Sequence, residues 1–173
     1  MPARPTAPAT TELLRESHLF DGISDSVVSR LASTLPTELA LPGELVLSEG
    51  ELTAHMFVVL SGEVEVLHKG DGDHDVRLAL LGPGDWVGEM AILDVQPRSA
   101  SVRALAPTTL LRLSTPDTRR LIQEPEPLQY AQLVGNIARE LARRLRVADR
   151  IIANASGHLV QRYVVESRRP PPG

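Results

Sequence analysis

The sequence predicts an α+β protein in which an antiparallel, jelly-roll-like β-roll follows N-terminal helices and precedes one long C-terminal helix. Between residues 39 and 113, apolar and polar residues alternate with a period of two, as in half-buried strands. Near both ends, apolar residues instead recur at helical spacing. The 12 glycines and 14 prolines favour many turns, and therefore short strands rather than a helical bundle. Short strands separated by glycine turns are typical of a rolled antiparallel sheet.

The N-terminal part begins with residues 1–10, which are rich in Pro, Ala and Thr and are expected to be a disordered lead-in. The folded domain is expected over residues 11–155. One or two short helical turns come first, from Leu13, Leu14, Leu19 and Phe20. Ser24 is placed to cap a second helix, which Pro36 ends.

The β-roll is predicted over about residues 39–113. Its turns include Ser61-Gly62 and the run from Gly82 to Asp85, and residues 69–75 (KGDGDHD) form a hairpin tip. The predicted strands are 45–47, 56–60, 63–66, 76–81, 86–87, 100–106 and 109–113.

After the β-roll, the sequence returns to helix. Ser114 or Thr115 is predicted to cap a helix that has Pro116 in its first turn. Pro125 and Pro127 interrupt it, and a long helix is expected over about residues 128–155. Residues 156–173 are expected to form a short helix or a tail with a Pro-rich end, which leaves no room for a DNA-reading domain.

Composition excludes several classes of protein. There is no cysteine, so disulfides, thiolate metal sites and cysteine nucleophiles are excluded. The five histidines form no His-x-His pair of the kind a metal-dependent cupin needs. The run Asp71, Asp73 and Asp75 departs from a calcium loop, because Val76 stands where Gly is required and Gly82 where Glu is required. We therefore expect no metal and no enzymatic activity.

Charge and hydropathy indicate a cytoplasmic protein. No apolar run approaches the ~20 residues of a membrane helix, and the N-terminus has no secretory signal. The net charge is −4, but it is unevenly divided, with +5 from Arg139 onward and −9 before it. The basic C-terminal part could touch phosphates, although such a helix face is usually only solvated, so DNA binding is not expected. Of the basic residues, 17 are Arg and one is Lys, a bias that usually reflects a GC-rich genome rather than function. We expect a bacterial protein.

One segment, residues 88–100, interrupts the alternation and has the chemistry of a phosphate site. Gly88 precedes a short helical turn whose free N–H groups favour an anion. The small Ala91 leaves room for a ligand, Arg98 offers paired donors, and Ser99 adds a hydroxyl. Glu89 could accept from a sugar hydroxyl. From spacing alone, Glu89 and Arg98 could equally form a structural ion pair across a loop.

The segment GEMAILDVQPRSASVRA, residues 88–104, resembles the phosphate-binding cassette of the cyclic nucleotide-binding domain family. This family includes catabolite-activator-type regulators, regulatory subunits of cyclic nucleotide-dependent kinases, and gated channels. The resemblance spans about residues 13–155. Its flanking signature is Gly43, Glu49-Gly50-Glu51, the VVLSGEVEV run with Gly62, and Gly84-Asp85.

The resemblance implies a role for each cassette residue. Gly88 and Ala91 would give backbone donors to the cyclic phosphate, and Glu89 would hold the ribose 2′-OH. Arg98 would pair with the equatorial phosphate oxygens, with Ser99 beside it. The complete set of expected ligand-binding residues is Gly88, Glu89, Met90, Ala91, Arg98, Ser99, Ala100, Arg144 and Asp149.

The long helix carries two apolar stripes. The first is a heptad seam, and the second is available to the sheet (Leu133, Ile137, Val147 and Ile151). Two stripes favour two partners, so a homodimer through residues 134–155 is predicted, the alternative being a single helix packed on its own sheet. The seam consists of Val134, Ala138, Leu141, Leu145, Ala148, Ile152 and Ala155.

The base preference stays open between cAMP and cGMP. The resemblance implies two adjacent hydroxyl residues on the helix for adenine, but Ala148 and Asp149 occupy those positions. Asp149 could accept from guanine, or it could be a solvated or Arg-paired helix residue. The family at large favours cAMP.

These features predict a free-standing receptor for a 3′,5′-cyclic mononucleotide that signals to an unidentified partner protein by moving its C-terminal helix. The alternatives are an interaction module of the same fold that does not respond to nucleotide, and a regulator with residual DNA contact.

Overall fold

The computed structural model describes residues 7–70, 74–94 and 96–167, and the side chains of residues 10–70, 74–94 and 96–154. The chain divides into two compact units, Met1–Asn136 and Ile137–Gly173. The first unit contains the helices and strands of the β-roll, and the second contains most of the long helix.

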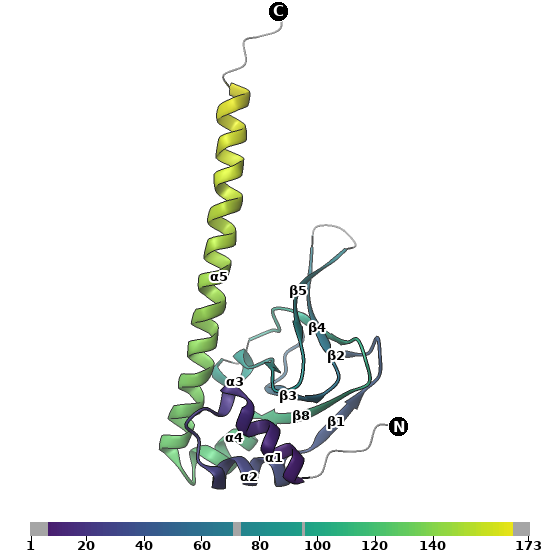
Figure 1. Ribbon diagram of the computed structural model, residues 1–173, viewed down its shortest axis with the longest axis vertical. Helices are drawn as coiled ribbons and strands as arrows, with labels where there is room; N and C mark the ends of the chain where they lie inside the picture. Colours follow the sequence, from purple (N-terminus) through teal and green to yellow (C-terminus); the bar gives the residue numbers. More distant parts are fainter. Residues whose placement is uncertain (1–6, 71–73, 95, 168–173) are drawn as a thin grey trace, which may run out of the picture. The chain divides into compact units, whose positions relative to one another are not determined.

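The first unit confirms the predicted antiparallel β-roll (Figure 1). One sheet has the strand order β1-β8-β3-β6 and the other has the order β2-β7-β4-β5, and every pairing is antiparallel. The strands are β1 (Thr37–Ala40), β2 (Leu45–Leu47), β3 (His55–Ser61), β4 (Val64–Lys69), β5 (Asp75–Leu81), β6 (Trp86–Val87), β7 (Ser101–Ala104) and β8 (Thr108–Ser114).

The core between the two sheets is aliphatic, as the alternation predicts. In β4, Val64 and Val66 face this core while Glu65 lies on the opposite face. Glu65 is nevertheless buried, because the Arg103 guanidinium of the neighbouring strand covers it at 2.7 Å. The core cluster consists of Ala40, Leu47, Phe57, Val59, Val64, Val87, Val102, Ala104 and Leu110.

The N-terminal helices differ from the prediction in one respect. The first helix, α1 (Ala7–Glu16), begins inside residues 1–10, so the expectation of disorder over that whole stretch is wrong from Ala7 onward. A 3₁₀ turn, η1 (His18–Phe20), and α2 (Asp25–Thr34) follow, with Ser24 at the predicted cap position of α2. Residues 1–6 lie outside the described residues.

The helical segment after the β-roll begins with a capping box. The Ser114 hydroxyl accepts from the Asp117 backbone N–H, while the Asp117 carboxylate accepts from the Ser114 N–H. The elements of this segment are α4 (Thr115–Thr118) and a π-helical turn, η2 (Arg119–Gln123). One further helical turn, α3 (Met90–Leu93), lies within the β-roll, between β6 and β7.

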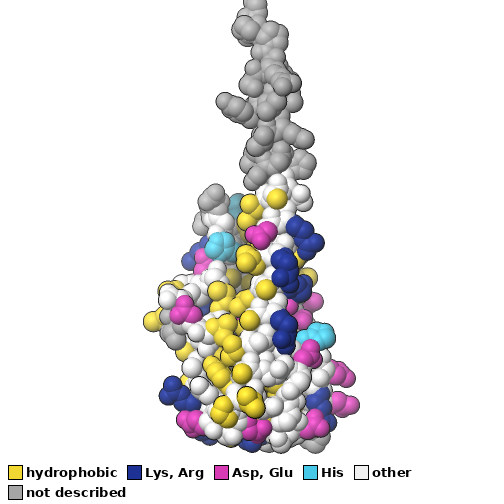
Figure 2. All heavy atoms as spheres, turned by 90° about the vertical axis from the view of Figure 1, so that its left-hand side faces the viewer, with side chains coloured by type: hydrophobic (Ala, Val, Ile, Leu, Met, Phe, Trp, Pro, Cys, Tyr) yellow, Lys and Arg dark blue, Asp and Glu magenta, His cyan; other side chains and the backbone are white. Residues whose placement is uncertain are grey.

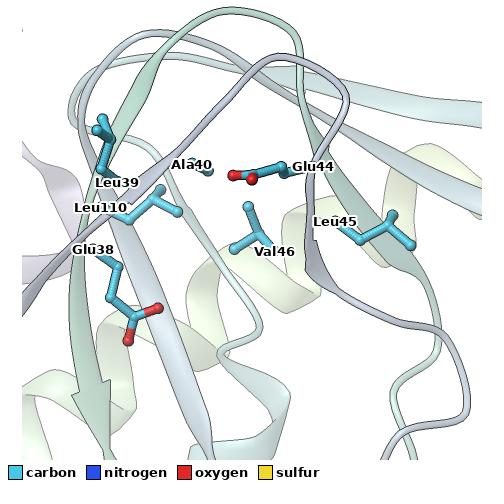
Figure 3. A pocket seen from close by; sticks show the side chains of 7 residues that line it. All are labelled: Glu38, Leu39, Ala40, Glu44, Leu45, Val46 and Leu110. Carbon is cyan, nitrogen blue, oxygen red and sulfur yellow. The ribbon is translucent and has the colours of Figure 1, made fainter. Parts of the chain in front are cut away.

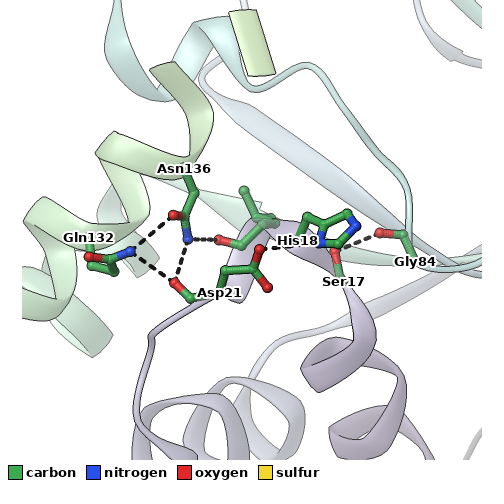
Figure 4. Close-up of polar contacts among 7 residues, drawn as sticks. Ser17, His18, Asp21, Gly84, Gln132 and Asn136 are labelled. Atoms are coloured by element: carbon green, nitrogen blue, oxygen red, sulfur yellow. Dashed lines mark hydrogen bonds and ion pairs between the residues drawn. The ribbon is translucent and has the colours of Figure 1, made fainter. Parts of the chain in front are cut away.

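Three amides on the first turns of the long helix α5 (Pro127–Ser167) bind the N-terminal segment of the same unit, and Figure 4 shows two of them, Gln132 and Asn136. Asn136 is buried and its Nδ2 donates to the Leu19 and Asp21 carbonyls, at 2.7 and 3.0 Å. Gln132 Nε2 also donates to the Asp21 carbonyl, and Gln129 Oε1 accepts from the Ser24 N–H. These hydrogen bonds join the beginning of α5 to η1 and to the cap of α2.

Helix α5 continues to Ser167, so the predicted end near Ala155 and the separate short helix after it are wrong. A serine and a glycine at 156 and 157 were weak helix breakers, since neither removes a backbone hydrogen bond as proline does. The Pro-rich end, residues 168–173, lies outside the described residues. Figure 2 shows apolar and arginine side chains on the described surface of this helix.

On the described part of α5, Glu140 forms an ion-pair cluster with two arginines. Glu140 accepts hydrogen bonds from Arg143 and Arg144, at 2.7 to 2.9 Å. The hydrogen bond from Arg143, against a smaller opposing effect of burial, lowers the pKa of Glu140 from its usual 4.5 to about 2. The depressed pKa means that this carboxylate stabilises the helix when ionised.

We expect this stabilisation to be present above about pH 4.5 and to be lost as the pH falls toward 2, because protonation of Glu140 removes the acceptor. Glu140→Gln should lower the melting temperature by about 1–2 °C at pH 6, with a difference that shrinks as the pH falls. Circular dichroism melts of the parent and the variant across this range measure it. Glu16→Gln, on an exposed residue, is the control, and an equal effect there would contradict the assignment.

Candidate functional site

The predicted cassette forms one continuous loop between β6 and β7. Gly88 follows β6 with a φ of +82°, a left-handed conformation that glycine adopts without steric cost. Glu89 stands at the N-cap of α3, and α3 is the short helical turn expected there. A Cβ atom at Gly88 would lie 2.9 Å from Arg98 Nη1 and 2.9 Å from Leu47 Cδ1. Glycine is therefore needed at this position both for its φ and for the approach of Arg98.

Arg98 is the buried cation of the loop, with 7% of its surface exposed. Its Nε donates to Thr53 Oγ1 and its Nη1 to the Gly88 carbonyl, each at 3.0 Å. Its Nη2 donates to the His55 carbonyl. The guanidinium is thus hydrogen-bonded to three neutral oxygens, and the Glu89 carboxylate acts on it through its charge.

The remaining donors of Arg98 suit an anion. A guanidinium has five N–H groups in a planar fork, and within the described part of the chain three of them have protein acceptors. Burial lowers the pKa of Arg98, although the Glu51 and Glu89 carboxylates act to raise it. The other two N–H groups of this buried cation could donate together to a phosphate. The negative charge of the phosphate would then offset the free-energy cost of removing the guanidinium from water.

The backbone around Arg98 is held by the strand-to-strand loop at residues 49–51. Arg98 N–H donates to the Glu51 carbonyl at 2.9 Å, and Gly50 N–H donates to the Arg98 carbonyl at 2.8 Å. The Glu49 N–H donates to Ser101 Oγ at 3.0 Å. This pairing places the Glu-Gly-Glu segment, expected only as part of the flanking signature, against the cassette, where its backbone fixes the position of the arginine.

Glu89 is the buried acid of the loop, with 3% of its surface exposed. Ala91 is buried as well, and its N–H donates to the Gly88 carbonyl at a long 3.3 Å. Met90 and Ser99 are exposed, with Ser99 Oγ 4.0 Å from Met90 Sδ. Ala100 is half-buried at the start of β7. The first unit therefore gathers seven of the nine predicted residues into one loop.

The other two predicted residues, Arg144 and Asp149, belong to α5 in the second unit. Arg144 Nε donates to Glu140 Oε1 at 2.9 Å. Asp149 is exposed. Of the second apolar stripe, Leu133 is buried within the first unit, whereas Ile137, Val147 and Ile151 belong to the second unit, and their packing on the sheet stays a prediction.

Sequence reasoning did not anticipate the neutral acceptors of Arg98. Thr53 and His55 stand in an unremarkable stretch, and two of the three acceptors are backbone carbonyls, which any residue type provides. Burial lowers the pKa of His55, as do the charges of Arg112 and Arg98. The neutral imidazole lies edge-on to Phe57, with ring centroids 5.1 Å apart.

Two features are absent from the part of the chain that the structure describes. No cluster of three or more His, Asp or Glu side chains there could hold a metal ion. Among the described helices, none is both long and apolar enough to cross a membrane.

Comparison with known proteins gives a consistent result. The family described as "Cyclic nucleotide-binding domain" matches residues 38–125, about half of the chain. The cyclic AMP receptor protein of Thermus thermophilus is 38% identical over 136 residues, which are 79% of this chain and 61% of that protein.

Solved structures agree with this match. The catabolite activator protein of Thermus thermophilus superposes with a TM-score of 0.72 at 36% identity, covering 81% of this chain and 63% of that one. A cyclic nucleotide-binding domain from Methylobacillus flagellatus has a TM-score of 0.72 at 28% identity, covering 86% and 83%. This chain thus spans about three fifths of the length of the Thermus proteins that it matches.

Proposed function

This chain belongs to the cyclic nucleotide-binding domain family, and on that premise we propose that it is a cytoplasmic, non-enzymatic receptor for a 3′,5′-cyclic mononucleotide, with cAMP preferred over cGMP. The observation that carries the proposal is the buried Arg98, which has three protein acceptors among the described residues for its five N–H groups and shares its loop with a buried acid, Glu89, and the tight turn at Gly88. This arrangement matches a ligand that offers both a phosphate and a sugar hydroxyl. The preference for cAMP rests on the relatives, which include a cyclic AMP receptor protein.

Each cassette residue is assigned to a different part of the ligand. Arg98 pairs with the phosphate oxygens, and Ser99 adds a hydroxyl at the edge of the loop. Glu89 accepts from the ribose 2′-OH. The backbone at Gly88 and Ala91 faces the phosphate, and Met90 and Ala100 complete the wall of the site. On α5, Arg144 and Asp149 are assigned to the ligand and to the choice of base, respectively.

Thermal unfolding tests this proposal directly. At about 100 times its dissociation constant, cAMP should stabilise the protein by roughly 2.7 kcal/mol, which is about 5–10 °C for a chain of this size. A smaller shift with cGMP at the same concentration would support the stated preference, and a larger one would reverse it. The control is 5′-AMP, which lacks the cyclic phosphate. Equal shifts with 5′-AMP, or no shift with either cyclic nucleotide, would refute the proposal.

Glu89→Gln is expected to weaken cAMP binding by roughly 1.5–3 kcal/mol, because the ribose hydroxyl loses a charged acceptor. Calorimetric titration with cAMP measures the loss. Titration with 2′-deoxy-cAMP is the matched control, since the variant and the parent should bind that ligand with similar affinity. A loss of the same size for both ligands would show that Glu89 does not act through the 2′-OH.

Signalling is proposed to proceed by a shift in the population of α5 positions. Nucleotide binding favours one position of the helix, and a partner protein distinguishes that position from the other. The amide contacts of Gln129, Gln132 and Asn136 support this role, because they make the beginning of α5 continuous with the N-terminal helices of the same unit.

A homodimer through residues 134–155 is part of the proposal. Leu145 and Ile152, both on the heptad seam, are each 62% exposed, and a second copy of the helix would cover them. Leu145→Arg with Ile152→Arg should convert a dimer into a monomer in sedimentation velocity. Leu128→Arg, on an exposed residue of α5 outside the seam, is the control. A parent protein that sediments as a monomer at micromolar concentration would refute the dimer.

A further inference from the structure

A shallow pocket of about 330 Å³ opens where the two sheets are joined by the turn between β1 and β2 (Figure 3). It is separate from the cassette, and none of its residues belongs to the proposed nucleotide site. We call it the β1–β2 pocket. It is lined by Glu38, Leu39, Ala40, Glu44, Leu45, Val46 and Leu110.

The inner surface of the β1–β2 pocket is apolar. Ala40 and Leu110 belong to the core cluster, and Val46 packs against it, so the pocket reaches the edge of the aliphatic core. On the outside, Leu39 is 42% exposed and Leu45 is 57% exposed, with the exposed Leu41 in the turn between them. Exposed leucines gathered on so short a stretch indicate a surface that a partner covers.

Two open strand edges flank the pocket. In the described part of the chain, β1 pairs with β8 alone and β2 pairs with β7 alone, so each strand ends its sheet. The outer edge of such a strand presents backbone N–H and C=O groups to an added strand. An extended peptide can bind there through its backbone while alternate side chains enter the pocket.

The rim of the pocket is negatively charged. Figure 3 shows the Glu44 carboxylate turned toward Ala40, and its Oε2 accepts from the Leu41 N–H at 2.6 Å. Glu38 is half exposed and has Arg112 Nε at 3.5 Å. Two carboxylates and one guanidinium give the rim a net negative charge. In a bound segment, this charge favours a cationic residue next to the apolar residue that enters the pocket.

We propose that the β1–β2 pocket docks an extended segment of another protein in which aliphatic side chains alternate with Arg or Lys. The aliphatic side chains cover Ala40, Val46 and Leu110, and the cations pair with Glu38 and Glu44. The backbone of the segment runs along an open strand edge. None of the residues that line the pocket belongs to the cassette.

The test uses a fluorescein-labelled heptapeptide of alternating arginine and leucine, with fluorescence anisotropy as the readout at physiological salt. Peptides of alternating glutamate and leucine, and of alternating arginine and serine, are the controls. The arginine–leucine peptide should bind more tightly than either control. In NMR spectra of the ¹⁵N-labelled protein, it should shift the amide signals of residues 38–46 and leave those of the cassette in place.

Glu38→Gln combined with Glu44→Gln should weaken binding of the arginine–leucine peptide by about 5- to 30-fold, since two charge pairs are lost. Glutamine at 44 keeps an acceptor for the Leu41 N–H, so the turn is preserved. The matched control is Glu12→Gln with Glu16→Gln, which removes the same charge from an exposed helix face and should leave the affinity within twofold. A second variant, Leu39→Ser with Leu45→Ser, tests the apolar part, and its melting temperature establishes that it is folded.

Three results would overturn the proposal. The first is an equal loss of affinity in the control variant, which would mean attraction to net charge alone. The second is a set of amide shifts outside the β1–β2 pocket. The third is a change in sedimentation of the pocket variants without peptide, which would show that a second copy of this chain occupies the surface.

Discussion

Arg98→Ala is expected to weaken cAMP binding by roughly 2–5 kcal/mol, or about 30- to 4,000-fold, because the bound monoanion loses its charged partner. The size of the effect follows from burial. With 7% of its surface exposed, Arg98 lies where water screens the phosphate poorly, so solvent cannot replace the guanidinium. Calorimetric titration of the variant and the parent measures the difference.

Two controls separate binding from folding in this experiment. Arg98→Lys keeps the positive charge but removes the planar pair of donors, so its affinity should lie between those of the parent and the alanine variant. Arg112→Ala removes a guanidinium that pairs with Glu38 and should leave the affinity unchanged. The melting temperature of Arg98→Ala is needed as well, since the Gly88 and His55 carbonyls lose a donor. Unchanged affinity in a folded Arg98→Ala protein would mean that the phosphate is bound elsewhere.

Gly62→Ala is expected to destabilise the β-roll strongly, by about 2–5 kcal/mol. Gly62 lies in the turn between β3 and β4 with a φ of +88°, where a Cβ atom costs roughly 1–2 kcal/mol. That Cβ would also lie 2.4 Å from Thr108 Oγ1 and 2.6 Å from the Pro107 carbonyl oxygen. Relief of the overlap requires backbone movement, which adds about 1–3 kcal/mol. Denaturant unfolding measures the total.

Gly43→Ala is the matched control for this prediction. Gly43 has the same φ of +88°, but nothing lies within 4 Å of its hypothetical Cβ. Its substitution should therefore cost only the conformational strain. If the two alanine variants were equally stable, the close approach between the β3–β4 turn and Thr108 would not contribute to the stability of the β-roll.

The prediction of the fold succeeded where local signals were strong. Alternation in residues 64–66 placed Val64 and Val66 toward the core and Glu65 on the other face, and the structure has them there. Prediction failed at Ala7 and beyond Ala155, where the helix boundaries carry no strong cap or breaker. β1 was missed as a separate strand, because its four residues run half-buried, exposed, exposed and buried, which is not a period of two.

The site was predictable as a set of residue types but not as a set of contacts. Gly88, Glu89 and Arg98 form a recognisable spacing, because a phosphate-binding loop needs a tight turn, an acid and a cation in close order along the chain. Two of the three acceptors of Arg98 come from Thr53 and His55, more than forty positions away, and no local pattern marks a carbonyl as an acceptor.

The sequence by itself determined the class of this protein, namely the period-two β-roll, the helices on either side of it, and the cassette between two strands. Each of these features depends on the order of residue types within a few positions, and that order is visible in the sequence. Tertiary structure alone decided that Arg98 is buried with donors to spare, that Gly62 touches Thr108, and that two open edges flank a pocket between β1 and β2. These depend on segments far apart in the chain meeting in space, and only the packing of the two sheets brings them together.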